Sequence, residues 1–236
     1  MADFKSLTEG PEQFKRDIMR RFAEVLISVV LTALILFIAA GSIKWFYAWL
    51  FLVTTVLTIV YNALRLPPDL IAERGRITEN VEKWDPTLTK LMLIPWFGSF
   101  LIAGLDFRWG WPPELGAGWH LGGLAVYVLG NYLILRAMIV NHFFSTAVRI
   151  QPDRGHTVCS SGPYRYIRHP GYAGMIVYNL AAPLALGSLW ALVPASITAG
   201  LFVLRTRLED EALLKKLPGY RQYAARTRYR LIPGVW

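Results

Sequence analysis

Two polar segments in the second half of the sequence contain residue types that could build a binding site. The first, Cys159 to Gly174, reads CSSGPYRYIRHPGYAG and combines Gly and Pro with tyrosines, arginines and a histidine. The second begins at Arg205 and reads RTRLEDEALLKK, in which Glu209 to Glu211 interrupt a basic stretch. Carboxylates, aromatic faces and backbone groups freed by Gly and Pro could bind a cationic or polyhydroxylated small molecule.

The three acidic residues also have a purely structural interpretation. Arg205 precedes Glu209 by four residues, and Arg207 precedes Glu211 by four. Such pairs on an exposed helix face contribute only a few tenths of a kcal/mol. For this helix taken alone, surface ion pairs are the simpler hypothesis.

The apolar run between the two segments favours a shared site. Residues 171–204 contain Gly187-Ser188 at their midpoint. One continuous helix of this length would exceed the roughly 30 Å hydrocarbon core of a bilayer, so a helical hairpin is expected. The hairpin would return the acidic helix to the side of CSSGPYRYIRHPGYAG.

Several common chemistries find no motif in the sequence. The histidines His142, His156 and His169 lack metal-ligand spacing, so no metal is expected. There is no nucleophile elbow or P-loop, and GAGWHLGG does not satisfy the dinucleotide fingerprint, which excludes a Rossmann domain. A nucleotide-containing cofactor would therefore need a helical pocket at the membrane edge.

Long apolar runs must position these segments. The chain of 236 residues is 54% hydrophobic and only 17% charged, and the runs Val25–Ile43 and Trp45–Leu64 carry no charge. Weaker runs follow at 91–105, 119–135, 171–187 and 189–204. The sequence predicts an all-α, polytopic membrane protein with about five to six transmembrane helices, including the C-terminal hairpin.

Four polar residues lie within the run 119–135 or shortly after it. They are Asn131, Arg136, Asn141 and His142. In one interpretation these residues face a cavity or the interior of the bundle. In the other, the asparagines form hydrogen bonds between helices and Arg136 extends its charged end to the membrane surface. Both interpretations remain open from the sequence.

Basic residues predict the orientation. All but Lys44 and Arg108 fall in four segments, 1–24, 62–90, 136–170 and 205–236, which lie on one side if the N-terminus is cytoplasmic. The positive-inside rule therefore predicts cytoplasmic N- and C-termini, in a bacterial inner membrane or the endoplasmic reticulum according to the organism. Because membrane orientation explains the excess of basic over acidic residues, no nucleic-acid partner is expected.

Three regions are predicted along the chain. Residues 1–24 carry Phe14, Ile18 and Phe22 at a spacing of four, which suits an amphipathic segment on the membrane surface. Residues 25–118 hold the N-terminal transmembrane helices and loops, including a short helix between the Pro-Pro and Asp-Pro breakers of the polar loop. Residues 119–236 are the predicted catalytic region, whose cytoplasmic loops and last helix would enclose the pocket.

Together with the motifs C-terminal to it, the first polar segment resembles a known family. HTVCSSGPYRYIRHPGYAG (156–174), the hairpin, R-x-R-x-E-x-E, GYRQY and the closing RLIPG are similar in order and spacing to the isoprenylcysteine carboxyl methyltransferase family. The resemblance covers roughly residues 120–236. It implies S-adenosylmethionine bound without a Rossmann domain, and a lipophilic acceptor that enters from the bilayer and is methylated on a prenylcysteine-like carboxylate.

The resemblance also implies site residues. An arginine that orients the substrate falls on Arg205 or Arg207, and the cofactor carboxylate on Glu209 or Glu211, since both arginines precede a glutamate by four. The other implied cofactor contacts are Gln151, His156, Thr157, Val158, Cys159, Tyr164, His169, Pro170, Gly171 and Tyr172.

Elementary chemistry separates the possible acceptors. A carboxylate is ionised at neutral pH, so it needs no general base, and an arginine fork can hold it. An amine or thiol would need His169 or Glu209 as a base. The alternatives are a phospholipid or thiol methyltransferase of the same fold, an NADPH-dependent enzyme like the sterol reductases, whose R-H-P-x-Y element is similar, and a scaffold without activity.

Overall fold

The structure is a computed structural model that describes residues 10–76 and 81–236. The described part is all-α, without strands, as predicted. Its helices are α1 (Pro11–Ala40), α2 (Phe46–Arg65), α3 (Pro68–Gly75), α4 (Asp85–Trp109), α5 (Ala117–Val140), α6 (Pro170–Leu186), α7 (Leu192–Lys216) and α8 (Tyr220–Arg226). Two 3-10 turns, η1 (Pro152–Arg154) and η2 (Gly162–Arg165), lie between α5 and α6.

Four of these helices have the length and composition of membrane spans. They are α1, α2, α4 and α5. Large apolar side chains such as Ile38, Ile94 and Leu129 are mostly exposed on their outer faces. Lipid tails are as apolar as Leu, so these faces suit a bilayer. The prediction of a polytopic helical membrane protein is confirmed.

Helices α6 and α7 form the hairpin that the sequence predicts. Helix α6 ends at Gly187, whose φ is 84°. A Cβ at Gly187 would lie 2.3 Å from the ring of His120, so both backbone conformation and space require glycine there. After this turn, α7 runs back along α6 without a break to Lys216.

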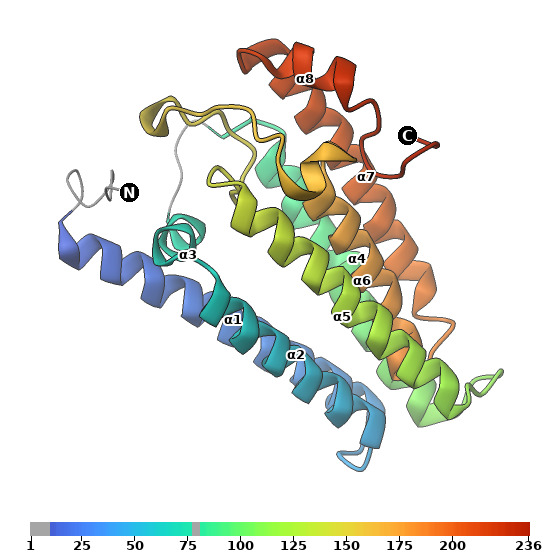
Figure 1. The fold of residues 1–236 in the computed structure, drawn as a ribbon. Coiled ribbons are helices and arrows are strands. Elements are labelled where there is room, and N and C mark those ends of the chain that lie inside the picture. Colours follow the sequence, from blue (N-terminus) through green and yellow to red (C-terminus); the bar gives the residue numbers. More distant parts are fainter. Residues whose placement is uncertain (1–9, 77–80) are drawn as a thin grey trace.

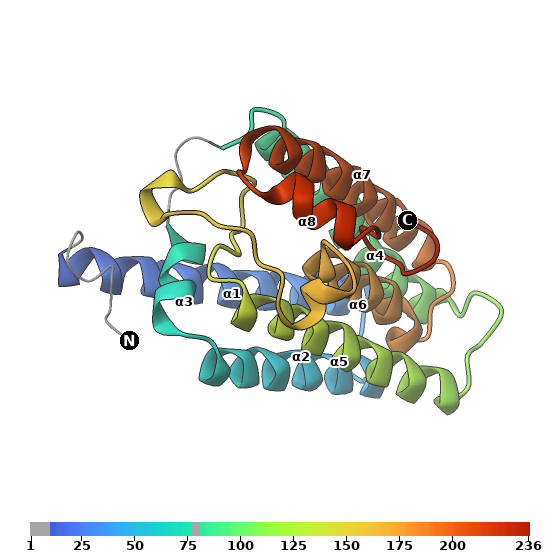
Figure 2. The ribbon, with the colours of Figure 1, turned by 45° about the horizontal axis from the view of Figure 1, so that its top comes forward.

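The bundle has two distinct ends. Figure 1 shows the short turns 41–45, 110–116 and 187–191 at one end, while α3, the segment 141–169 and α8 gather at the other. The second view, Figure 2, shows the same arrangement with α8 lying over the segment 141–169. The polar segments singled out in the sequence therefore meet at one end of the bundle.

The predicted N-terminal amphipathic segment does not form a separate element. Its described part, from Pro11 to Glu24, is the beginning of α1 and continues into the first span with no break at residue 24. No helix-breaking residue occurs between Pro11 and Gly41, so nothing ends the helix within this stretch. Residues 1–9 of the predicted segment lie outside the described residues.

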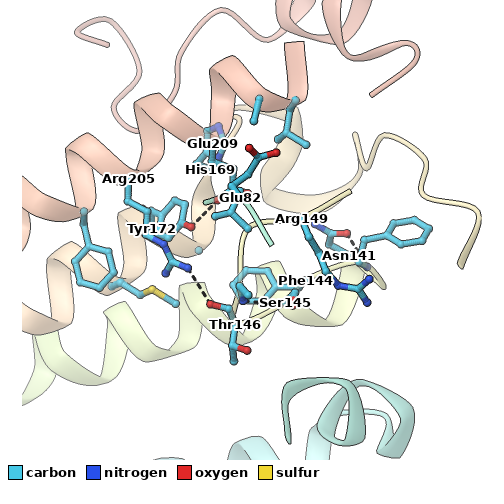
Figure 3. Close-up of a pocket in the computed structure, with 18 of the residues that line it drawn as sticks. Glu82, Asn141, Phe144, Ser145, Thr146, Arg149, His169, Tyr172, Arg205 and Glu209 are labelled. Carbon is cyan, nitrogen blue, oxygen red and sulfur yellow. Dashed lines mark hydrogen bonds between the residues drawn. The ribbon is translucent and has the colours of Figure 1, made fainter. Parts of the chain in front are cut away.

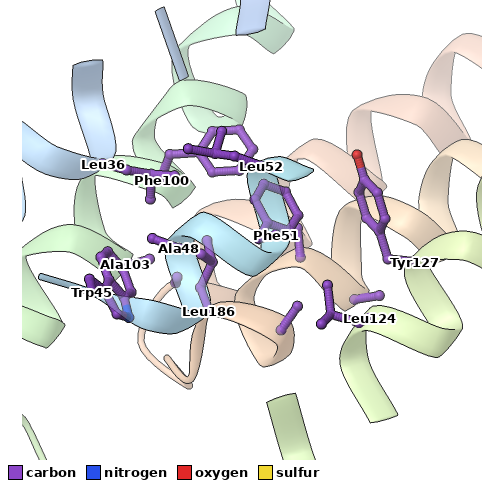
Figure 4. Close-up of a cluster of buried hydrophobic side chains, with 14 of the residues drawn as sticks. Leu36, Trp45, Ala48, Phe51, Leu52, Phe100, Ala103, Leu124, Tyr127 and Leu186 are labelled. Atoms are coloured by element: carbon purple, nitrogen blue, oxygen red, sulfur yellow. The ribbon is translucent and has the colours of Figure 1, made fainter. Parts of the chain in front are cut away.

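An apolar core holds the spans to the hairpin. In Figure 4, Leu36 of α1, Phe51 of α2, Phe100 of α4 and Tyr127 of α5 converge near Leu186 of α6. These side chains are between 0% and 5% exposed, with rings in tilted or edge-on contact. The core lies in the half of the bundle away from the polar segments.

Small residues bring α5 and α6 into close contact. A Cβ at Gly130 would lie 2.7 Å from the backbone nitrogen of Tyr178, and one at Gly174 would lie 2.7 Å from the Gly130 carbonyl. Such close backbone approach through glycine is common between membrane helices. It fixes α6, and therefore the site residues at its N-terminal end, against α5.

Candidate active site

A cavity of about 450 Å³ lies at the polar end of the bundle. Figure 3 shows side chains from the segment after α5, from the start of α6 and from α7 pointing toward it. Ten of the predicted site residues line it: Arg205, Glu209, His156, Thr157, Val158, Cys159, Tyr164, His169, Gly171 and Tyr172.

The phase of α7 separates the two arginine-glutamate pairs. Arg205 and Glu209 line the cavity. Arg207 and Glu211 instead form a 3.0 Å ion pair with each other, and their side chains are 67% and 41% exposed. The ambiguity of two residues in the sequence therefore corresponds to two faces of one helix, only one of which borders the cavity.

Arg205 is held by residues from distant segments. Its Nε donates to Oδ1 of Asp85 at 2.8 Å, and its Nη2 donates to Oδ2 at 3.2 Å and to the carbonyl of Thr146 at 2.8 Å. Asp85 also accepts a hydrogen bond from the Val148 amide. Both partners of this ion pair are at least 90% buried, so the Arg205 fork already holds a carboxylate of the protein.

Tyr172 connects the beginning of α6 to α7. Its hydroxyl donates to Oε2 of Glu209, and the Arg205 guanidinium lies 5.5 Å from the centre of its ring. The hairpin explains this geometry, because it places the first turn of α6 beside the last turns of α7. The result is a carboxylate and an aromatic face on one wall of the cavity.

Asp210 is the centre of a buried polar cluster behind that wall. Its carboxylate accepts hydrogen bonds from Arg168 (2.9 Å), Tyr220 (2.8 Å) and Arg230 (2.8 Å), and it faces Nε2 of His169 at 3.2 Å. Burial would raise the pKa of Asp210, but the contacts with His169, Tyr220 and Arg168 outweigh it and hold the pKa well below its ordinary value.

The C-terminal segment closes over this cluster. The amides of Arg168 and His169 donate to the carbonyls of Tyr229 and Arg230. The segment that carries RLIPG is therefore bound directly to the R-H-P element. The order of these motifs was visible in the sequence, but no pattern there indicated that Asp210 joins them.

The segment after α5 supplies a second wall. Asn141 donates to the Tyr164 hydroxyl at 3.1 Å, and the Tyr223 hydroxyl donates to the Tyr164 carbonyl at 2.7 Å. Burial raises the pKa of Tyr164, which keeps its phenol neutral. The Cys159 thiol donates to the Val140 carbonyl. Asn141 thus borders the cavity, as one of the two interpretations of the polar residues expected.

Two other predicted contacts lie behind the cavity wall. Gln151 is 1% exposed, donates to the Phe143 carbonyl and accepts from Arg154, so its amide is used within the loop. Pro170 is buried as the first residue of α6. Together with Arg207 and Glu211, these residues are absent from the cavity lining.

Several lining residues were not predicted. Phe144, Thr146 and Arg74 come from segments without a motif. Asp85 does not line the cavity but binds Arg205, and the sequence indicated it only as part of a helix-breaking Asp-Pro pair. One signal was available for Phe144. Gly171 lies so close to its ring that a Cβ would be 2.5 Å away, so the glycine in H-P-G-Y leaves room for an aromatic neighbour.

Metal-ligating groups are sparse in the part of the chain that the structure describes. Within residues 10–76 and 81–236, no group of three or more His, Cys, Asp or Glu side chains could hold a metal ion. The polar groups at the cavity are instead hydrogen-bonding and ion-paired.

Comparison with known proteins covers the same region of the chain. Residues 123–215 match the model of the isoprenylcysteine carboxyl methyltransferase family. The protein-S-isoprenylcysteine O-methyltransferase of Schizosaccharomyces pombe is 29% identical over 108 residues, which cover 44% of this chain and 46% of that protein. The Saccharomyces cerevisiae protein of the same name is 30% identical over 100 residues, 39% of this chain and 40% of that protein.

A plant protein gives a longer match. The probable protein-S-isoprenylcysteine O-methyltransferase of Oryza sativa subsp. indica is 26% identical over 117 residues, 48% of this chain and 61% of that protein. The chain spans about half the length of the curated relatives that it matches. Residues 123–215, which include most of α5 and α7, all of α6 and the segment between α5 and α6, carry the sequence pattern of the isoprenylcysteine carboxyl methyltransferase family.

Proposed function

We propose that this chain is an integral membrane methyltransferase that uses S-adenosylmethionine to methylate the carboxylate of a lipophilic, prenylcysteine-like acceptor. The observation that carries the proposal is the cavity wall formed by Glu209 and Tyr172, which faces the polar segment 156–159 at the end of a membrane helix bundle. The family match over residues 123–215 supports the same activity.

The residues present fit the cofactor. S-adenosylmethionine supplies an electrophilic methyl group on a sulfonium when bound. Glu209 would bind its polar groups, the rings of Tyr164 and Tyr172 would face its positive charge, and the backbone of 156–159 would hold its adenosine part. All of these residues border the cavity of about 450 Å³, a volume within the range of small-molecule sites.

The contacts of His169 favour a carboxylate as the acceptor. An amine or thiol would have to lose a proton, and His169 is the candidate base. Its Nε2 lies 3.2 Å from Asp210 and 3.3 Å from the Tyr220 hydroxyl, so this nitrogen is committed to the buried cluster. Glu209, the other candidate base, accepts a hydrogen bond from the Tyr172 hydroxyl. A carboxylate needs neither, because it is ionised at neutral pH.

The contribution of the protein is then to orient the reactants and exclude water. The buried Asp85–Arg205 pair fixes α4 against α7, and the Asp210 cluster joins α7 to α8 and to Arg168, just before α6. A rigid, water-poor cavity can hold a nucleophile in line with the methyl group it attacks.

Calorimetry on the detergent-solubilised protein tests the cofactor. Wild type is expected to bind S-adenosylmethionine, and Glu209→Ala and Tyr172→Phe should each weaken binding roughly tenfold or more, as expected for a lost charged hydrogen bond. Glu211→Ala is the matched control, since it removes the same group from the exposed face of the same helix. Tight binding of NADPH without S-adenosylmethionine binding would disprove the proposal.

A transfer assay tests the acceptor. The protein is incubated with methyl-labelled cofactor and panels of prenylcysteines, phospholipids and thiols. Label in a base-labile ester of a prenylcysteine is the expected product. Label only in phospholipids or thiols would assign the site to those acceptors instead.

A further inference from the structure

Arg74 has a buried donor at the cavity and no ion pair with a described carboxylate. Arg74, on α3, lines the cavity, and its Nη1 is buried with no hydrogen-bond partner among the described residues. Its guanidinium lies 5.5 Å from the centre of the Phe144 ring. A buried donor of this kind costs about 1–3 kcal/mol unless a ligand or water satisfies it, and more for a charged group.

The other arginines around the cavity already have acidic partners. Arg205 holds Asp85, Arg168 holds Asp210, Arg149 binds Glu73 at 2.7 Å, and Arg21 lies 3.3 Å from Glu24. At these four positions the guanidinium already lies within ion-pair distance of a carboxylate of the protein. The buried Nη1 of Arg74, by contrast, has no acceptor among the described residues.

The charge of Arg74 survives its burial. Burial lowers its pKa to about 9, and the positive charges of Arg21 and Arg205 act in the same direction. At neutral pH the guanidinium is still protonated. Arg21 and Arg205 are paired with Glu24 and Asp85, so the positive charge that an anion would meet at this part of the cavity is that of Arg74.

Arg74 also lies where two cavities meet. A second cavity of about 360 Å³ lies between the spans and is lined largely by apolar side chains of α1, α2, α4, α5 and α6. Both cavities are lined by Arg74, Arg21, Ser28, Trp96, Met175 and Tyr178. A ligand with an anionic end and an apolar chain would therefore have its charge at Arg74 and its chain among the membrane helices.

We infer that Arg74 binds the carboxylate of the lipophilic methyl acceptor, whose apolar chain occupies the second cavity. This rests on the proposed function and changes one expectation from the sequence, which assigned the carboxylate to Arg205 or Arg207. Arg205 is occupied by Asp85, and Arg207 lies on the exposed face of α7. Arg74 is thus a specificity-determining residue contributed by the short helix α3.

Binding of matched ligands tests the assignment. The affinities of an S-farnesylated N-acetylcysteine and of its carboxamide are measured through tryptophan fluorescence, since Trp96 borders both cavities. Wild type should bind the acid at least tenfold more tightly than the amide. Arg74→Gln should lose this preference with little change for the amide, whereas Arg74→Lys should keep part of it. The control Arg65→Gln makes the same charge change at an exposed position and should behave as wild type.

The outcomes separate this inference from the proposed function. Equal binding of acid and amide by wild type, or an unchanged preference in Arg74→Gln, overturns the inference while S-adenosylmethionine binding leaves the proposed function standing. Absence of S-adenosylmethionine binding to wild type removes both. Competition with phosphatidate tests a lipid source of the anion; if phosphatidate, and not the farnesylated acid, depends on Arg74, the assignment to the acceptor is wrong.

Discussion

At the residue scale, three consecutive acidic residues of α7 have three different environments. Glu209 borders the cavity, Asp210 is fully buried among cationic and phenolic groups, and Glu211 is on the exposed face. Their side chains differ little in chemistry. The three side chains point in different directions around the helix axis. For this reason alone, Glu209 has a proposed ligand-binding role, Asp210 a structural role and Glu211 a surface ion pair.

Asp210→Asn should destabilise the protein strongly. Removing the carboxylate leaves Arg168 with no acidic partner in a buried site, a change that typically costs about 3–5 kcal/mol in free energy of unfolding. Glu211→Gln, one residue away, should change it by no more than about 0.5 kcal/mol, because both partners of that pair are exposed. Denaturant unfolding in micelles measures both variants, and similar losses in the two would contradict the buried cluster.

The order of the motifs predicts a set of site residues, but it does not predict which face of α7 borders the cavity. The R-x-R-x-E-x-E repeat satisfies the family pattern in two registers, and only packing against α6 chooses between them. Asp85 and Arg74 were inaccessible to sequence reasoning for another reason. They lie 120 and 131 positions before Arg205, at the start of α4 and on α3, in a stretch without a motif. Only the bundle brings Asp85 against α7 and Arg74 to the cavity that Arg205 lines.

At the scale of elements, the contact between α5 and α6 determines whether the site is assembled. The close approach at Gly130 and Gly174 sets the position of α6, whose first turn carries Gly171 and Tyr172. Helix α6 in turn packs against α7 through the hairpin. Changes in the middle of the membrane region should therefore affect ligand binding at its end.

Gly130→Val should separate α5 from α6. The new side chain would overlap the backbone of Tyr178, and overpacking of this kind costs about 1–3 kcal/mol or more. We expect a lower thermal midpoint and weaker S-adenosylmethionine binding in the same variant. Gly122→Val is the control on the same helix, since a Cβ there has no neighbour within 4 Å, and it should leave both quantities near wild type. A normal Gly130→Val protein would show that α6 does not depend on this contact.

The secondary structure was predictable where one signal dominated. Uncharged runs gave α1 and α2, prolines bounded the short helix α3, and the Gly187 turn gave the hairpin. The N-terminal region was predicted less well. Apolar residues at every fourth position fit a surface helix and the start of a longer helix equally well. Only the absence of a breaker before Gly41 distinguishes them.

At the scale of the whole molecule, the two ends of the helix bundle differ both in their charge and in the segments that form them. The polar end holds α3, the segment 141–169 and α8, and the opposite end holds short turns. The described parts of the basic segments lie at the polar end, and the positive-inside rule predicts that this end is cytoplasmic.

Cysteine labelling tests this orientation. In a Cys159→Ser background, Glu114→Cys lies in the turn between α4 and α5, and Gln222→Cys lies on α8. A membrane-impermeant maleimide should label Glu114→Cys in intact cells and Gln222→Cys only after the membrane is permeabilised. The reverse pattern would mean that the cavity faces the other side of the membrane.

Helix α7 is unbroken, so its length determines which of its side chains face the cavity. One helix leads from the hairpin turn to Arg205 and Glu209 and ends at Lys216. Each added or deleted residue would rotate everything beyond it by about 100° and replace the cavity face by the outer face. Among homologous chains we therefore expect freely exchanged side chains on the outer face of α7, but a fixed number of residues between Gly187 and Arg205.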